Sequence, residues 1–168
     1  MLQIPGATGS IVATPSTEYQ QEEYLGKLCT VVPAILVTSG IYMMKKENAE
    51  PSSTDWLLAL SGPVLKRSLR TWDGSPLIMI EEAYARVWSK SVGAVFNTHF
   101  CEENCSLTAD LVVFNVEGAK IVDAVREGKP VNLSISAFSD TSPRLIGPRS
   151  EREHIVDNIT GQSVHVVL

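Results

Sequence analysis

Apolar and polar residues alternate along the chain from Val92 onward, with the period of two that is typical of a β-strand. The residues that share one face are Ala94, Phe96, Thr98 and Phe100, and those on the other are Val95, Asn97, His99 and Cys101. A polar loop over 102–104 leads to a second β-prone run, residues 107–114. The two runs predict a β-hairpin with a polar tip.

A second pair of β-prone runs, 34–38 and 41–44, surrounds a Ser39-Gly40 break and predicts another hairpin. The uncharged stretch 28–44 is close to the shortest length that crosses a bilayer as a helix. It contains Pro33 and several Thr and Val residues. We therefore expect buried strands here rather than a transmembrane span, with peripheral membrane contact left open.

Three segments have the spacing of apolar residues that is typical of helices. Residues 63–72 and 76–90 each begin at a proline, which favours the first turn of a helix. A third helix is expected over 115–127, with Asn115 as its N-cap and Gly128 after its end.

The last third of the chain predicts more β-structure. Residues 131–137 alternate strictly, and residues 163–168 are a terminal strand. The strand 107–114, the helix 115–127 and the strand 131–137 together predict a βαβ unit with a parallel crossover. Residues 150–153 match a capping box, so a short fourth helix competes with a strand over 154–159.

These elements predict a single α+β domain whose mixed β-sheet, built from hairpins and one βαβ unit, packs with three to four helices. A length of 168 residues suits one domain. Residues 1–19 are rich in Gly, Pro, Ser and Thr, so we expect a flexible N-terminal arm followed by the domain over 20–168.

Charge and cysteine content narrow the partners and the compartment. The net charge is −5, and binding to nucleic acid through its phosphates needs a basic surface, so nucleic acid is not an expected partner. Three cysteines cannot all pair within one chain, and no signal peptide is evident. We therefore expect an intracellular, cytoplasmic protein.

The densest group of chemistry-bearing residues lies at the predicted hairpin tip, residues 99–105. Alternation places His99 and Cys101 on one strand face, and the loop turns Cys105 back toward them. Imidazole and thiolate are good zinc ligands, so these three residues are metal-site candidates. The sequence has no second ligand pair of CxxC or HxxxH type. A polar tip with two incidental thiols is therefore the favoured interpretation, and a redox or intersubunit disulfide role is a further alternative.

Six basic side chains are candidates for binding an anion or an acidic partner. They are Lys66, Arg67 and Arg70 on one predicted helical face, and Arg144, Arg149 and Arg152 in or beside a loop. On an acidic chain the alternative is that they are ordinary solvated surface, which we favour.

The sequence lacks the P-loop, GxGxxG and GxSxG signatures, and no cofactor is expected. Catalytic groups are not always local in sequence, so a small enzyme is an alternative. Its site would lie at the carboxyl ends of the βαβ strands, near Asn115 and residues 138–140.

We therefore expect a non-enzymatic binding or assembly protein that associates with itself or with another protein. A compact core, a flexible arm and a projecting polar hairpin are combined in small structural subunits, including viral matrix and coat subunits. This is a parallel of architecture, since no motif identifies such a family. The alternatives are the small enzyme and a metal-binding domain built on residues 99–105.

Overall fold

The computed structural model describes residues 2–3, 8–12, 18–44, 56–80, 90–143 and 153–168. The described strands are β1 (Leu2–Gln3), β2 (Gly9–Ile11), β3 (Gln20–Tyr24), β4 (Lys27–Thr38), β5 (Gly40–Met44), β6 (Trp56–Leu60), β7 (Pro76–Ile80), β8 (Lys90–Cys101), β9 (Ser106–Phe114), β10 (Asn132–Pro143) and β11 (Glu153–Val167). The described helices are α1 (Gly62–Arg67), α2 (Leu69–Trp72) and α3 (Asn115–Arg126).

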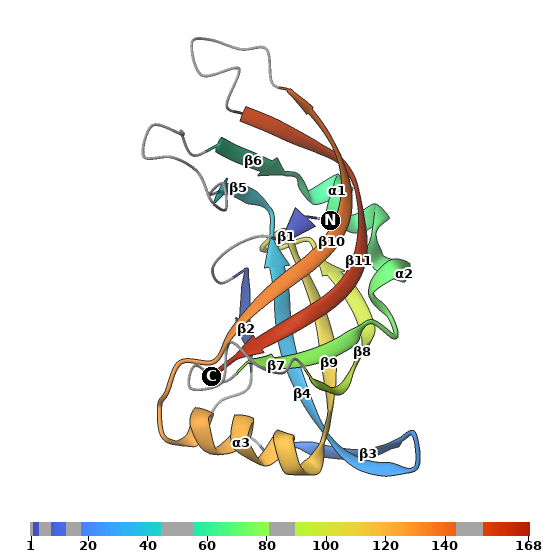
Figure 1. Cartoon of the computed structure of the whole chain (residues 1–168), viewed down its shortest axis with the longest axis vertical. Coiled ribbons are helices and arrows are strands. Elements are labelled where there is room, and N and C mark those ends of the chain that lie inside the picture. The colour runs from blue at the N-terminus through green and yellow to red at the C-terminus, as the bar shows by residue number, and fades with distance from the viewer. Residues whose placement is uncertain (1, 4–7, 13–17, 45–55, 81–89, 144–152) are drawn as a thin grey trace.

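Seven strands close into a mixed β-barrel, in the order β2, β4, β9, β8, β7, β11, β10 and back to β2 (Figure 1). Neighbouring barrel strands are antiparallel, except that β7 and β11 are parallel. The molecule is a mostly-β single domain, with three helices in its described segments. The mixed sheet and the single domain agree with the α+β prediction, but strands make up far more of the chain than that class implies.

The strand predicted for residues 131–137 is confirmed, and its alternation holds except at Ser136, which is 3% exposed beside a register shift. Leu133, Ile135 and Ala137 of β10 are at most 1% exposed, because every second side chain points inward. Asn132, between them in the chain, is exposed. The predicted terminal strand is confirmed too, since Val164 of β11 is fully buried in the same core.

The β8–β9 hairpin is confirmed, but a β-bulge changes which residues share a face. Asn97 has a φ of 53°, and the pairing register shifts beside it. Val95 before the bulge and Phe100 after it both pack on the barrel core, although strict alternation places them on opposite faces. The Asp73 carboxylate holds the bulge by accepting from the Thr98 N–H (3.1 Å) and hydroxyl (2.7 Å).

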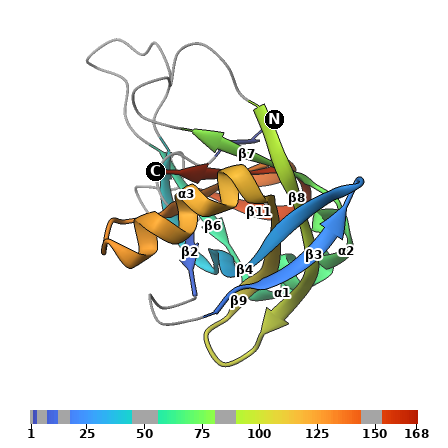
Figure 2. The same ribbon diagram turned by 90° about the horizontal axis from the view of Figure 1, so that it is seen from below.

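The helices pack at two ends of the barrel (Figures 1 and 2). The predicted helix over 63–72 forms α1 and α2, whose Leu65 and Trp72 are fully buried in the core. Figure 2, the view from below, shows α3 crossing in front of the strands. Ile121 of α3 enters the same core. The helix over 115–127 is therefore confirmed. Its N-cap is Phe114 rather than Asn115, whose side chain instead accepts a hydrogen bond from Thr30 (2.9 Å).

The helix predicted over 76–90 is wrong where the structure describes it. Residues 76–80 form β7, which pairs with both β8 and β11; residues 81–89 lie outside the described part. A short apolar run such as Leu77-Ile78-Met79-Ile80 fits a buried strand as well as a helix, and pairing on both sides decides for the strand. Residues 153–167 form β11, so the strand alternative holds there over the fourth helix.

The predicted βαβ unit is wrong. The strands before and after α3 are β9 and β10, which are not neighbours in the barrel. Three antiparallel pairings, β10 to β2, β2 to β4 and β4 to β9, separate them, so they run in opposite directions. The hairpin predicted across Ser39-Gly40 is also wrong, because β5 pairs with β6 and β4 pairs with β2, β3 and β9.

The structure differs from the predicted N-terminal arm in the described part of residues 1–19. Residues 9–11 form β2, which pairs with β4 on one side and β10 on the other and so completes the barrel. Gly9 approaches β4 so closely that a Cβ atom would lie 1.8 Å from the carbonyl oxygen of Ile35. A glycine in this segment is therefore needed for close strand packing rather than for chain mobility.

Candidate functional site

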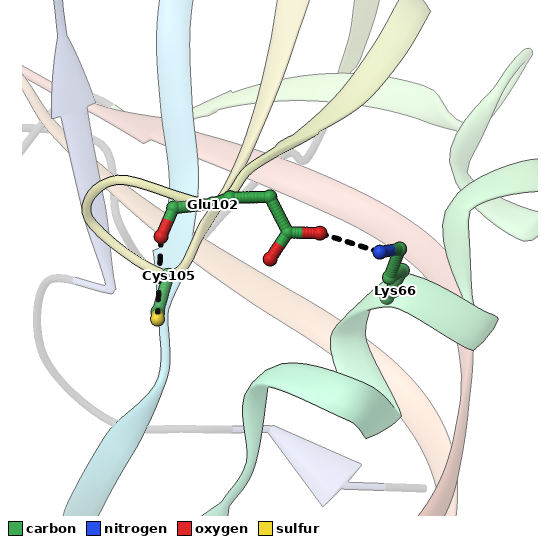
Figure 3. A network of polar contacts seen from close by, with 3 residues as sticks. All are labelled: Lys66, Glu102 and Cys105. Carbon is green, nitrogen blue, oxygen red and sulfur yellow. Dashed lines mark hydrogen bonds and ion pairs between the residues drawn. The ribbon is translucent and has the colours of Figure 1, made fainter.

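The tip of the β8–β9 hairpin, which carries the predicted metal ligands, is braced against the barrel (Figure 3). The Glu102 carboxylate pairs with the ammonium group of Lys66 on α1. The Ser39 N–H donates to the Cys105 carbonyl oxygen (2.9 Å), and the Cys105 thiol is directed at the Glu102 carbonyl oxygen (3.7 Å). The tip is thus tied to α1 and to the end of β4 instead of projecting freely.

The structure does not bring His99, Cys101 and Cys105 together as metal ligands. His99 is exposed, and its Nε2 lies 2.8 Å from the Asn97 side-chain oxygen. Among the described residues, no three His, Cys, Asp or Glu side chains converge in a metal-binding group. The three cysteines are free thiols: Cys29 is buried, Cys101 is partly buried and Cys105 is exposed.

The predicted basic cluster is partly engaged within the molecule. Lys66 pairs with Glu102 and lies 5.9 Å from the centre of the Phe100 ring. Arg67 donates to the backbone carbonyl of Asp157 (2.9 Å). Arg70 is exposed on α2. These contacts hold α1 against the hairpin tip and β11, so two of the three side chains have structural partners. The other three candidates, Arg144, Arg149 and Arg152, lie outside the described residues.

A groove of about 360 Å³ lies between β3, β4 and α3. Its lining residues are Tyr19, Gln21, Thr30, Asn115, Ala119, Val122, Asp123 and Arg126. A relay of side chains crosses its floor: Gln21 donates to the Thr30 hydroxyl (3.4 Å), which donates to Asn115 (2.9 Å). The groove therefore presents amide and hydroxyl groups together with one acidic and one basic side chain.

Tyr19 gives this groove its most distinctive group. Burial raises the pKa of the Tyr19 hydroxyl above its usual value, against the opposing effect of Arg126. The hydroxyl is inaccessible and has no hydrogen-bond partner among the described residues. Because it is covered, a ligand reaches it only if neighbouring side chains move. The groove suits a small polar molecule in composition, but it holds no arrangement of nucleophile and base.

Sequence reasoning singled out Asn115 and missed the rest of this groove. Its helical residues at 115, 119, 122 and 126 recur at the spacing of one helix face, which was a usable signal. Tyr19, just before β3, and Gln21 of β3 complete the lining, but Tyr19 lies in the segment expected to be a flexible arm. Residues 138–140, the other part of the expected enzyme site, belong to β10. Since β9 and β10 run in opposite directions, their carboxyl ends do not meet.

A different surface, on the outer face of β5, β6 and β11, carries apolar side chains toward solvent. Ile41 of β5 pairs with Ala59 of β6, which pairs with Ile155 of β11, so the three side chains form a row across one face. Ile41 is 63% exposed and Ile155 is 39% exposed. We call this row and strand β5 the β5 edge. The opposite face of the same strands is core, where Leu58 and Leu60 are buried.

A second exposed apolar group lies at the turn between β3 and β4 and at the start of α3. Leu25 is 74% exposed in the turn with a φ of 52°, Leu28 of β4 is 57% exposed, and Val116 of α3 is 76% exposed. The adjoining strand β3 carries Glu22 and Glu23, both exposed. This surface therefore mixes apolar and acidic groups, unlike the β5 edge.

Residues 28–44 belong to β4 and β5, and the prediction of buried strands is confirmed for the β4 part. Val32, Leu36 and Val37 are fully buried. Within the described segments, no helix has the length and hydropathy to span a membrane.

No protein-family model matches this sequence, and neither a curated protein nor a solved structure shows a significant match to the chain. Function is therefore inferred from the chain's own surfaces, of which the β5 edge and the groove beside α3 are the most distinct in chemistry.

Proposed function

We propose that this protein is a non-enzymatic assembly subunit that associates with copies of itself, as a structural subunit of matrix or coat type would. The observation that carries the proposal is the β5 edge. It combines an uncharged edge strand with an apolar row on the solvent face of the sheet. Natural proteins usually protect an edge strand with charges, prolines or a covering segment, because its free N–H and C=O groups pair readily with another strand.

The position of β2 supports assigning association to a sheet edge rather than to an N-terminal arm. A docking arm would be ordered only on association, whereas residues 9–11 pair with two strands of their own barrel. Deletion of the first 19 residues would therefore open the barrel instead of testing assembly. The experiment must use the full chain.

The test is the mass of the full chain in solution, measured by sedimentation velocity and by size exclusion with light scattering over a wide concentration range. One chain has a mass of 18.3 kDa. We expect a mass that rises with concentration to a multiple of this value. A constant mass of one chain up to about 1 mM, where even a very weak self-association becomes visible, would refute the proposal.

A further inference from the structure

Resting on the proposed function, we propose that two copies of the chain pair through their β5 strands, antiparallel, about a two-fold axis normal to the sheet. The partner is thus a second copy of this chain, and the shared element is the β5 edge. The two sheets then join into one continuous sheet.

The backbone of β5 offers the groups that such pairing needs. In the described part of the chain, β5 pairs with β6 alone and ends the order of strands. Alternate residues of an antiparallel strand direct their N–H and C=O groups to opposite sides. Half of the β5 backbone groups therefore face away from β6, where a second strand can bond to them.

The lack of charge on β5 indicates that the strand paired with its free edge is β5 of a second copy. Residues 40–44, Gly-Ile-Tyr-Met-Met, include no charged side chain, so pairing β5 with itself opposes no like charges. The other edge strand of comparable length, β3, carries Glu22 and Glu23. Antiparallel pairing of β3 with itself would bring these carboxylates against those of the other copy, which is destabilising. Of these two edges, only β5 is suited to homotypic pairing.

The side chains beside β5 are self-complementary under the same symmetry. A two-fold axis normal to the sheet keeps the same face outward in both copies. The register that we propose places the two Ile41 side chains nearest the axis, so that the row of Ile41, Ala59 and Ile155 in one copy continues into that of the other. Ile41, 63% exposed in one copy, gains apolar neighbours, which is the arrangement of an isologous interface.

The test compares lysine substitutions at two exposed aliphatic residues that lie on different surfaces of the full chain. Ile41→Lys adds one charge per chain beside the proposed axis, so two like charges meet in the dimer. Leu25→Lys adds one charge per chain in the β3–β4 turn, away from the axis. Both native side chains are mostly exposed, so both variants should fold, which circular dichroism and thermal melting verify. We expect Ile41→Lys to raise the dissociation constant at least roughly 100-fold in sedimentation equilibrium, and Leu25→Lys to change it less than about threefold.

The outcomes separate this inference from the proposed function. If the unmodified chain is monomeric, both fail. If it associates and Ile41→Lys associates equally well, or if Leu25→Lys weakens association as much as Ile41→Lys does, self-association stands and the β5 interface is refuted.

Crosslinking gives a second readout that does not depend on weakening the dimer. In a background with Cys101→Ser and Cys105→Ser, the remaining Cys29 is buried. Ile41→Cys should then yield a covalent dimer with a short bismaleimide at a concentration where the chain associates, and Leu25→Cys should yield little. Equal yields at the two positions would overturn the two-fold β5 pairing.

Discussion

Substitution of Gly161 by alanine tests whether the helices at one end of the barrel fit β11 as tightly as the structure indicates. Gly161 lies in β11, next to a register shift in its pairing with β10. A Cβ atom there would lie 2.6 Å from two ring carbons of Trp72 and 3.1 Å from the Thr71 carbonyl oxygen. Non-bonded carbons prefer about 3.5–4.0 Å, so the added methyl group is roughly 1 Å too close to the ring.

The Trp72 ring has little freedom to move away. It is fully buried, and its Nε1–H donates to the Ser68 hydroxyl (2.9 Å), which donates to the Leu65 carbonyl (2.7 Å). Overpacking of this kind costs about 1–3 kcal/mol. For a chain of this size, each kcal/mol lowers the melting temperature by about 2–4 °C, so we expect Gly161→Ala to melt about 2–12 °C lower.

The assay is urea unfolding and thermal melting of Gly161→Ala, Trp72→Ala and the double variant. Trp72→Ala removes both ring carbons that the methyl group would meet, so the cost of Gly161→Ala should fall by about 1 kcal/mol or more in the Trp72→Ala background. Gly62→Ala is the control, because its Cβ would meet only the edge of the Phe100 ring, at 3.3 Å. An unchanged melting temperature for Gly161→Ala, or an equal cost in both backgrounds, would refute the reasoning.

Three further measurements follow from contacts elsewhere. Burial lowers the pKa of His165, so the fold favours its neutral ring; stability should fall as pH decreases below about 6.5, and His165→Gln should flatten this dependence in urea titrations from pH 7.5 to 5. Gly118→Ala places a Cβ 3.0 Å from Thr30 and should cost about 1 kcal/mol in urea unfolding, part of which returns with Thr30→Ala. Lys66→Gln should change the unfolding free energy by less than about 1 kcal/mol, because Lys66 and Glu102 are 58% and 71% exposed; a larger loss in urea would show that the ion pair contributes more than a solvent-exposed pair should.

The parts of the fold that depend on local pattern were predictable from the sequence. Alternation identified β8, β9 and β10, and helical spacing identified α1 and α3, because one buried face sets the period in each case. The parts that depend on pairing were not. The apolar run 76–80 has no decisive period, and it becomes a strand because β8 and β11 lie on its two sides.

Barrel closure explains the largest difference from prediction. Thr8 and Gly9 lie in a segment whose Gly, Pro, Ser and Thr content suggested an arm, and glycine is depleted in strands. Thr8 and Gly9 instead pack closely against β4 and β10, two strands that are distant from them in sequence. The same closure fixes the direction of β10 after α3. Because β10 runs opposite to β9, the carboxyl ends of these strands do not meet, and the enzyme site expected there does not form.

The candidate surfaces were harder to foresee than the fold. An apolar row across β5, β6 and β11 joins residues 41, 59 and 155, and no local pattern connects them. The residues 99–105 attracted attention through their types alone, and the structure uses Glu102 and Cys105 to brace the hairpin. A side chain's chemistry was therefore visible in the sequence, but its neighbours were not.

Because β2 lies between β4 and β10, the barrel cannot close until β10 has been synthesised. The Thr8 N–H donates to the carbonyl oxygen of Leu133 (2.7 Å), a residue 125 positions further along the chain. At about 5–20 residues per second, a ribosome needs on the order of 10 s to make that partner. Such long-range pairing also places the domain among slow folders. Throughout that interval the edge of β2 that β10 later covers has no partner, so the nascent chain is the stage most in need of protection from aggregation.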